Sequence, residues 1–401
     1  MKVLQINSVC GIGSTGRICT GIAEILEKNG HECLIAYGRE SVPERYKKYA
    51  HKIGNEFNVK LAALSARIFD NEGFSNKRAT LRLIEKIKQY APDIVHLHNL
   101  HGYYINIEIL FDYLKSANIP VVSTLHDCWT MTGHCAYFDS IECKKWCEEG
   151  CSDCPLKTDY PKSIVLDNSK RNFAKKKKIF TKLFNLTFVT PSLWLSEIAK
   201  KSFLGKYRVE TIYNGIDLET FKPTKGSIRE KYGIGSKKII LGVANVWDKR
   251  KGLPDLIKLA ELMGEEYRVV VVGLSPKQRD ALPQNIIGLT RTNSTKELAE
   301  LYSEACVYFN PTYEDNFPSA NQEALACGTP VVTYPTGGSP EAIDAKSGVV
   351  TKERSPESAV EAIKIAESLR REDCIARAKQ FDINEKYCEY LKLYEEILAK
   401  A

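Results

Sequence analysis

The sequence predicts an α/β protein with two domains, each a parallel β-sheet flanked by helices. Short apolar runs alternate with helix-like segments along most of the chain, which is the pattern of parallel sheets. A length of 401 residues is typical of two domains, and a hydrophobic content of 43% is enough for large cores. The turn-rich residues 213–217 separate two series of elements and are the predicted hinge.

The first domain is predicted to span residues 1–210. It begins with a strand at 3–8, a glycine-rich turn at 11–16 and a helix at 18–29 that stops near Gly30. Further short apolar runs give strands at residues 32–37, 94–97, 121–125 and 188–190, the last being its expected final strand.

The second domain is predicted to span residues 211–380. Ser294 to Glu297 form a capping-box sequence at a helix start, and Gly328 is a helix stop signal. The expected strands are residues 239–243, 267–272, 286–289, 307–310 and 331–334, and the expected helices are 255–263, 294–306 and 320–326. Residues 384–398 form a last helix with one tyrosine- and leucine-rich face, within a terminal segment taken as 381–401.

Composition indicates a cytoplasmic protein. The sequence contains no run of about 18 apolar residues, so no membrane-spanning helix is predicted. The N-terminus reads as a strand and not as a signal peptide, so the 13 cysteines are expected in a reducing compartment. The net charge is only +7.

Basic residues concentrate at 170–182, in and around the run Lys175 to Lys178. This run is either a solvated helix face or a surface that contacts anionic lipid at the inner face of the plasma membrane. Nucleic acid is not an expected partner, because the charge is local and aromatic residues are not interleaved with it.

Residues 313–341 carry the most informative motif, a loop followed by a short helix, a strand and a glycine turn. Backbone N–H groups at a helix start bind phosphate oxygens, so the segment from Phe317 to Ser319 is a candidate phosphate site. Glu323 lies one turn further on and can accept hydrogen bonds from ribose hydroxyls. Gly337 and Gly338 allow the backbone to approach a ligand closely.

A basic loop follows the strand at 239–243. Arg250 and Lys251 are placed before a glycine and a helix, where ligands of open α/β sheets bind. Fixed cations stabilise the charge that grows on a diphosphate when a sugar–phosphate bond breaks. An exposed basic loop is the alternative.

The first domain offers a glycine loop and several histidines. Gly13 and Gly16 precede a helix that can hold a negative group, although their spacing disfavours a dinucleotide site. His126 follows the strand at 121–125, at its carboxyl end. His96, His98 and His101 are further candidates, and packed, hydrogen-bonded histidines are the alternative.

Six cysteines lie between Cys128 and Cys154, in a loop-rich insertion at about 128–160. Clustered thiols in a reducing compartment indicate a metal site, and four thiolates around zinc would hold such a loop together. Free structural thiols are the alternative, with Cys128 and Cys147 as spares. The predicted ligands are Cys135, Cys143, Cys151 and Cys154.

The spacing of Asp315 and Glu323 resembles the acidic signature of retaining family-4 glycosyltransferases, which transfer sugars from nucleotide-sugar donors and have two Rossmann-like domains facing across a cleft (the GT-B fold). The histidine and cysteine motifs resemble those of members that make bacterial polysaccharides. Asp315 stands where that family usually has Glu, and Asn245 where it usually has Arg.

This resemblance implies a hexosyltransferase using a UDP- or GDP-sugar and a glycan or lipid-linked glycan acceptor, with no metal in the chemistry. Arg250 and Lys251 would clamp the diphosphate, Glu323 would bind the ribose, and Asp315 and His126 would lie near the donor sugar. Gly13 and Gly16 would line the cleft, and the last helix would cross back onto the first domain.

Two other functions are compatible with the residues. A sugar-nucleotide epimerase of the same architecture would need no acceptor, and a non-enzymatic module would bind nucleic acid in a salt-sensitive way. The sequence identifies neither the sugar and base nor the acceptor, the linkage or the oligomeric state.

Overall fold

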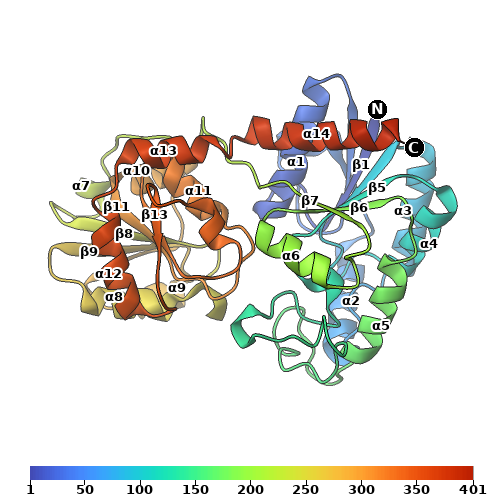
Figure 1. The fold of residues 1–401 in the computed structure, drawn as a ribbon, viewed down its shortest axis with the longest axis horizontal. Helices are drawn as coiled ribbons and strands as arrows, with labels where there is room; N and C mark the ends of the chain where they lie inside the picture. Colours follow the sequence, from blue (N-terminus) through green and yellow to red (C-terminus); the bar gives the residue numbers. More distant parts are fainter. Residues whose placement is uncertain (401) are drawn as a thin grey trace. The chain divides into compact units, whose positions relative to one another are not determined.

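The computed structural model describes residues 1–400, which form two compact units. The first unit is Met1–Tyr213 together with the segment from Asn384 onward, and the second is Asn214–Ile383. The boundaries fall three residues beyond the expected limits, inside the turn-rich segment 213–217 at the first crossing. Each unit is one parallel sheet flanked by helices, as the alternating pattern predicts (Figure 1).

The sheet of the first unit has seven strands in the order β3-β2-β1-β4-β5-β6-β7. Its central strands β4, β5 and β6 are buried along their whole length, which explains their continuous apolar character. The strands are β1 (Lys2–Asn7), β2 (Glu32–Tyr37), β3 (Ala50–Lys52), β4 (Ile94–Leu97), β5 (Val121–Thr124), β6 (Leu186–Thr190) and β7 (Arg208–Thr211).

The α-helices of this unit include α1, which starts at Gly13, five residues before the expected start. The expectation was wrong because two glycines were taken as turn residues, although Gly13 and Gly16 lie inside the helix. The helices are α1 (Gly13–Lys28), α2 (Glu56–Phe69), α3 (Lys77–Tyr90), α4 (Ile107–Ala117), α5 (Ser169–Phe180), α6 (Leu193–Lys201) and α14 (Ile383–Ala399), with 3-10 turns η1 (Glu44–Tyr49), η2 (Trp129–Met131) and η3 (Asp139–Ile141).

The final strand of the first unit is β7 and not the one at 188–190. β7 pairs with β6 at the sheet edge, and its four residues include one apolar side chain, Val209, and no buried position. The apolar-run criterion overlooks such an edge strand.

The sheet of the second unit has six strands in the order β10-β9-β8-β11-β12-β13. All five expected strands are present, and β13 is added at an edge. The strands are β8 (Lys238–Val243), β9 (Tyr267–Val272), β10 (Ile286–Leu289), β11 (Ala305–Asn310), β12 (Val331–Thr333) and β13 (Gly348–Val350).

Helices α8 and α12 pack together in this unit, and Leu256 and Ile363 are fully buried in its core. The helices are α7 (Ile228–Lys231), α8 (Leu253–Leu262), α9 (Pro276–Asp280), α10 (Thr295–Glu304), α11 (Ser319–Ala326), α12 (Pro356–Ala366) and α13 (Arg371–Lys379), with η4 (Lys249–Lys251) and η5 (Ser339–Ala342).

The two chain segments that lead into and out of the second unit are hydrogen-bonded to each other. The N–H of Ile216 donates to the Phe381 carbonyl at 2.8 Å, and the N–H of Ile383 donates to the Ile216 carbonyl at 3.0 Å. A Cβ on Gly215 would lie 2.5 Å from the Cα of Ile383, so glycine is required for this close approach.

The helix α14 returns to the first unit. Tyr394 donates to or accepts from His96 Nδ1 at 2.6 Å, and the hydroxyl of Tyr390 lies 3.2 Å from Thr124 Oγ1. Tyr387, Tyr390 and Tyr394 are all buried, so the tyrosine-rich face of this helix packs against the first sheet.

Candidate active site

The order of the second sheet reverses between β8 and β11, which places the loops after these strands side by side. Strands β9 and β10 continue on one side of β8, while β12 and β13 continue on the other side of β11. Ligands of open α/β sheets bind at the carboxyl ends of strands at such a switch point. The loops 244–252 and 311–319 are joined here by the Tyr313 N–H, which donates to the Arg250 carbonyl at 2.7 Å.

Lys251 and Asp315 form an ion pair across these two loops. The Lys251 ammonium donates to Asp315 Oδ2 at 2.5 Å, and both side chains are only partly exposed, at 23% and 17%. An anionic ligand at this place would compete with Asp315 for the ammonium group.

Arg250 is held by the loop that carries it. Its guanidinium donates from Nε and Nη2 to Asp248 Oδ2, and Nη1 lies 3.4 Å from the Glu314 carbonyl. Asp248 also caps the 3-10 turn η4 by accepting from the Arg250 N–H at 3.1 Å. The turn therefore fixes Arg250 and Lys251 beside the 311–319 loop.

Glu323 lies on the second turn of α11 and is buried, with 7% of its surface exposed. Its Oε2 accepts from the Tyr302 hydroxyl at 3.0 Å, and its Oε1 lies 3.4 Å from Ser319 Oγ. Helix α11 starts directly after Pro318, and no side chain caps its N-terminus. Phe317 is buried at this start.

Glycines keep the site compact. Gly252 has φ +73°, and a Cβ on it would lie 2.2 Å from the Pro311 carbonyl oxygen, so only glycine lets η4 pass this loop. Gly337, with φ +54°, and the buried Gly338 lie in the loop after β12. Asn321 of α11 donates to Ser339 Oγ at 2.9 Å and ties that loop to the helix.

The structure thus brings most of the predicted donor residues to one end of one sheet. Asn245 lies in the loop after β8 and is exposed. Two residues that support the site were not predicted: Tyr302, which orients Glu323, and Asp255, which accepts from the hydroxyls of Tyr313 and Tyr334 at 2.7 and 2.6 Å. Both lie on predicted helices, where nothing in the sequence marks them.

The first sheet reverses its order between β1 and β4. The loop after β1 contains Gly11, with φ +73°, whose N–H donates to the Gly16 carbonyl at 3.0 Å. Gly13 is exposed at the start of α1, whereas Gly16 is buried and a Cβ there would lie 3.1 Å from Val9 Cγ2. Gly16 therefore serves close packing of the helix on the loop.

His126, just past β5, belongs to a buried chain of hydrogen bonds. Its Nε2 lies 3.0 Å from His98 Nδ1, and His98 Nε2 lies 3.0 Å from Gln5 Oε1. The Gln5 amide nitrogen donates to the Cys19 carbonyl at 2.8 Å, so its oxygen is the acceptor toward His98. His98 is then protonated on Nε2 when neutral, and His126 donates from Nε2.

Burial keeps these rings neutral. It lowers the pKa of His126 to about 4 and the pKa values of His96 and His98 well below the usual range. His96, two residues before His98 in β4, has its Nε2 2.8 Å from Oγ1 of Thr124 in β5. These histidines are hydrogen-bonded and largely buried, which was the alternative interpretation for this group.

His101 forms a second network that sequence reasoning found only in part. Its Nε2 lies 2.7 Å from Asp127 Oδ2, and its Nδ1 lies 2.8 Å from the Tyr160 hydroxyl. The buried Glu72 accepts from the N–H groups of Gly102 and Tyr103 at 2.7 and 2.9 Å. Asp127, Tyr160 and Glu72 come from three separate segments, so their meeting depends on the fold.

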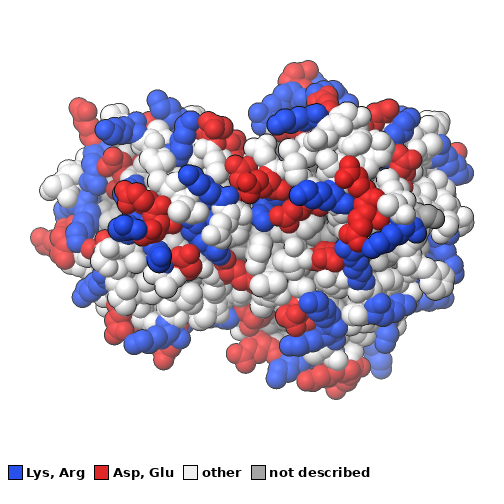
Figure 2. All heavy atoms as spheres, turned by 45° about the horizontal axis from the view of Figure 1, so that its top comes forward, with Lys and Arg blue, Asp and Glu red and all other residues white. Residues whose placement is uncertain are grey.

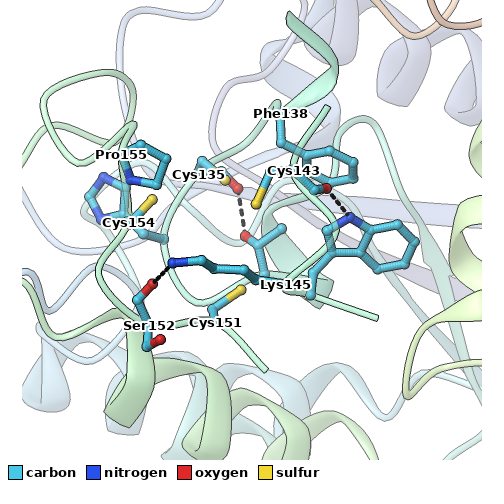
Figure 3. Close-up of a pocket in the computed structure, with 11 residues that line it drawn as sticks. Cys135, Phe138, Cys143, Lys145, Cys151, Ser152, Cys154 and Pro155 are labelled. Carbon is cyan, nitrogen blue, oxygen red and sulfur yellow. Dashed lines mark hydrogen bonds between the residues drawn. The ribbon is translucent and has the colours of Figure 1, made fainter. Parts of the chain in front are cut away.

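The four predicted cysteine ligands line one cavity of ≈ 20 Å³ in the first unit (Figure 3). Cys128 is buried elsewhere and Cys147 is exposed, and neither lines the cavity. Within residues 1–400, no three His, Cys, Asp or Glu side chains are already arranged as a metal-binding group.

The basic run on α5 is not a uniform surface. Lys176 is 1% exposed, and its ammonium donates to the Trp129 carbonyl at 2.8 Å, so it contributes nothing to a lipid-facing patch. Basic and acidic side chains are interspersed over the face drawn in Figure 2. Among residues 1–400, no helix is long and apolar enough to cross a membrane.

Solved structures with the same architecture define the fold class. A sucrose-phosphate synthase from Thermosynechococcus elongatus covers 100% of both chains with a TM-score of 0.72 and 16% identity. HepE of Anabaena, in complex with UDP, covers 99% of this chain and 100% of its own with a TM-score of 0.66 and 14% identity. The fold is GT-B.

Sequence comparison gives the family. The model of Glycosyltransferase Family 4 matches residues 15–220, and the model of Glycosyl transferases group 1 matches residues 224–381. The chain belongs to glycosyltransferase family 4 and is a glycosyltransferase, which confirms the resemblance seen in the motifs. A relative from Escherichia coli K12, named as a colanic acid biosynthesis glycosyl transferase (WcaC), is 24% identical over 88% of each chain.

Proposed function

We propose that this glycosyltransferase transfers a hexose from a nucleoside-diphosphate sugar to a glycan or lipid-linked glycan during polysaccharide synthesis. The observation that carries the donor assignment is the Lys251–Asp315 pair beside Arg250, at the end of the sheet where α11 begins. The UDP bound in HepE and the name of the E. coli relative support the donor and the acceptor classes.

In this proposal the diphosphate replaces Asp315 as the ion-pair partner of Lys251 and is also bound by Arg250. Cations held in place before reaction stabilise the leaving diphosphate without reorganising. Amides from Phe317 to Ser319 face the donor phosphates. Asp315, once released from Lys251, is available to a hydroxyl of the donor sugar, and Asn245 and the Gly337–Gly338 turn complete the donor side.

Glu323 binds the ribose. Its carboxylate is already oriented by Tyr302 and accepts hydrogen bonds from the two vicinal hydroxyls. In the first unit, Gly13 and His126 take part on the acceptor side, with Gly16 acting through packing. The reaction retains the anomeric configuration, side-chain cations replace a catalytic metal, and any zinc serves only the cysteine-rich loop. The enzyme works in the cytoplasm, at the inner face of the plasma membrane.

The donor site is tested by Lys251→Ala and Glu323→Ala, with Lys249→Ala as the matched control on the same 3-10 turn. Each site variant is expected to lose at least tenfold in transfer, equivalent to about 1.4 kcal/mol, while the control retains activity. Thermal shift with UDP- and GDP-sugars identifies the base. Unchanged transfer in both site variants would contradict the assignment.

The ribose contact is tested separately with a 2′-deoxy donor. The wild-type enzyme should bind it more weakly than the ribose form, whereas Glu323→Gln should discriminate less between the two. Proton NMR of the first product reports the anomeric configuration. Release of an epimerised nucleotide sugar without a free nucleoside diphosphate would favour the epimerase alternative.

A further inference from the structure

The cysteine-rich segment 128–168 holds together with little regular structure. Its only helical elements are the two 3-10 turns η2 and η3, and the rest is loop. Nevertheless four thiols from distant positions in this segment line one small cavity, where Cys135 is 7% exposed and Cys143, Cys151 and Cys154 are half-buried. Figure 3 shows them grouped around the same opening with Lys145.

Two of these sulfurs accept backbone hydrogen bonds. The N–H of Leu156 points to the sulfur of Cys154, two residues earlier, and the N–H of Gly133 points to the sulfur of Cys151. A Cβ on Gly133 would lie 2.8 Å from the Cβ of Cys151 and 2.2 Å from the Ser169 carbonyl oxygen, so glycine is needed for this approach. These N–H groups and the close approach at Gly133 fix the positions of the two sulfurs at the cavity.

A buried positive charge lies close to the cysteine cavity. Lys176 is 1% exposed, and its ammonium donates to the Trp129 carbonyl and lies 3.5 Å from the centre of the Trp129 ring. The thiols of Cys135 and Cys151 and the carboxylates of Asp70 and Glu72 are all close enough to influence that charge. A buried ammonium is costly unless an anion compensates it, and a metal with four thiolates carries a net charge of −2.

His134 adds a further unsatisfied group at the same cavity. It is 2% exposed, its Nδ1 lies 2.5 Å from Asp70 Oδ1, and its Nε2 is buried with no hydrogen-bond partner. A carboxylate that fixes one histidine nitrogen and aims the other is the usual support of a metal site.

We propose that Cys135, Cys143, Cys151 and Cys154 bind one structural Zn²⁺ ion as thiolates, in the cavity that His134 also lines. The thiols turn about their Cα–Cβ bonds to converge on the metal, and binding releases four protons. Lys176 and Lys145, whose ammonium donates to the Ser152 carbonyl at 2.9 Å, balance the charge. This inference is independent of the proposed reaction, because the ligands lie outside the donor site.

The test is the metal content of the full-length protein, purified without chelator and measured by elemental analysis. We expect about one zinc per chain, lost in Cys151→Ser and Cys154→Ser and retained in Cys147→Ser, the exposed cysteine that does not line the cavity. His134→Gln should retain the metal. Loss of zinc from His134→Gln with retention in Cys143→Ser would overturn the four-thiolate assignment.

A second measurement avoids variants that fail to fold. Cobalt is added to the zinc-depleted wild-type protein, and a thiolate-to-cobalt charge-transfer band is expected, together with tetrahedral d–d bands. A protein without zinc that gives no such band, or one with a disulfide among the four cysteines, would overturn the proposal.

Discussion

The two units have the same sheet topology at their switch points but use that place in opposite ways. In the second unit, the strand ends carry charged side chains that are partly exposed and paired across loops, as in Lys251–Asp315. In the first unit, the histidines after β4 and β5 are hydrogen-bonded inward, as in His126–His98–Gln5, and the one carboxylate beside them, Asp127, is buried against His101. A parallel sheet therefore supplies a location for ligands, and the residues placed there decide whether exposed charged pairs or buried hydrogen bonds dominate at that location.

Two glycine substitutions should give the largest difference in free energy of unfolding between the two units. Gly252→Ala places a methyl group against the Pro311 carbonyl in the left-handed region, and it should destabilise the second unit by about 3 kcal/mol or more. Gly13→Ala has the same backbone strain, but its Cβ would meet nothing within 4 Å, so about 1 kcal/mol is expected. Urea unfolding of both variants measures the difference, and equal losses would show that the steric contact at Gly252 is relaxed.

A fall in pH should destabilise the first unit more than the second. Unfolding lets His126 take up a proton near its ordinary pKa of 6.5, whereas the folded ring does so only near 4. Stability from this group is therefore complete above pH 6.5 and is lost as the pH falls toward 4, by roughly 3 kcal/mol. His96 and His98 act in the same direction.

All seven histidines lie in the first unit. In the second unit the groups with lowered pKa are carboxylates such as Glu297, at about 2, whose contribution is lost only below pH 4.5. Hydrogen exchange between pH 7 and 4.5 should show the first unit losing protection while β8 and β11 keep theirs. Parallel loss in both units would contradict this prediction.

Removing the end of the histidine chain should have a smaller effect. Gln5→Leu keeps the volume but leaves the Nε2–H of His98 without its acceptor, at an expected cost of about 1–3 kcal/mol in unfolding free energy. Gln284→Leu, at an exposed position of the second unit, is the control and should change little. If Gln5→Leu is as stable as the control, the chain of hydrogen bonds does not contribute to stability.

The smallest expected effect concerns the support of Glu323. Tyr302→Phe removes the hydroxyl that donates to Glu323 Oε2 and should weaken donor binding several-fold, about 1 kcal/mol. Tyr308→Phe removes a hydroxyl 3.3 Å from the Val243 carbonyl and should leave donor affinity unchanged. Calorimetric titration with the nucleotide distinguishes the two variants, and equal affinities would contradict the orienting role of Tyr302.

Sequence reasoning predicted the elements that have a strong local pattern. The buried strands β4 to β6, β8, β9, β11 and β12 were found because continuous apolar runs mark them, and the edge strand β10 was found from its apolar pair Ile286 and Ile287. The edge strands β3, β7 and β13 were not, because a half-exposed strand lacks such a run. The start of α1 was misplaced because glycine inside a helix is locally indistinguishable from glycine in a turn.

The residues of the candidate site that lie in loops after strands could be predicted from the sequence. Arg250 and Lys251 were identified by placement and charge and Asp315 by the family resemblance, and the structure shows that Lys251 and Asp315 pair with each other. Tyr302 and Gln5 were not identified, since each acts through a contact that only the fold creates. Lys176 shows the same limit, because its neighbours on α5 gave no sign that this one lysine is buried.

The helix α14 has a consequence for how the protein is made. The buried partners of His96 and Thr124 are Tyr394 and Tyr390, which follow them by 298 and 266 positions in the chain. The first unit therefore remains incomplete on the ribosome until α14 has been translated, whereas the second unit, Asn214–Ile383, can close earlier. A nonsense mutation just before α14 would remove these buried partners from the first unit and leave the sheet of the second unit complete.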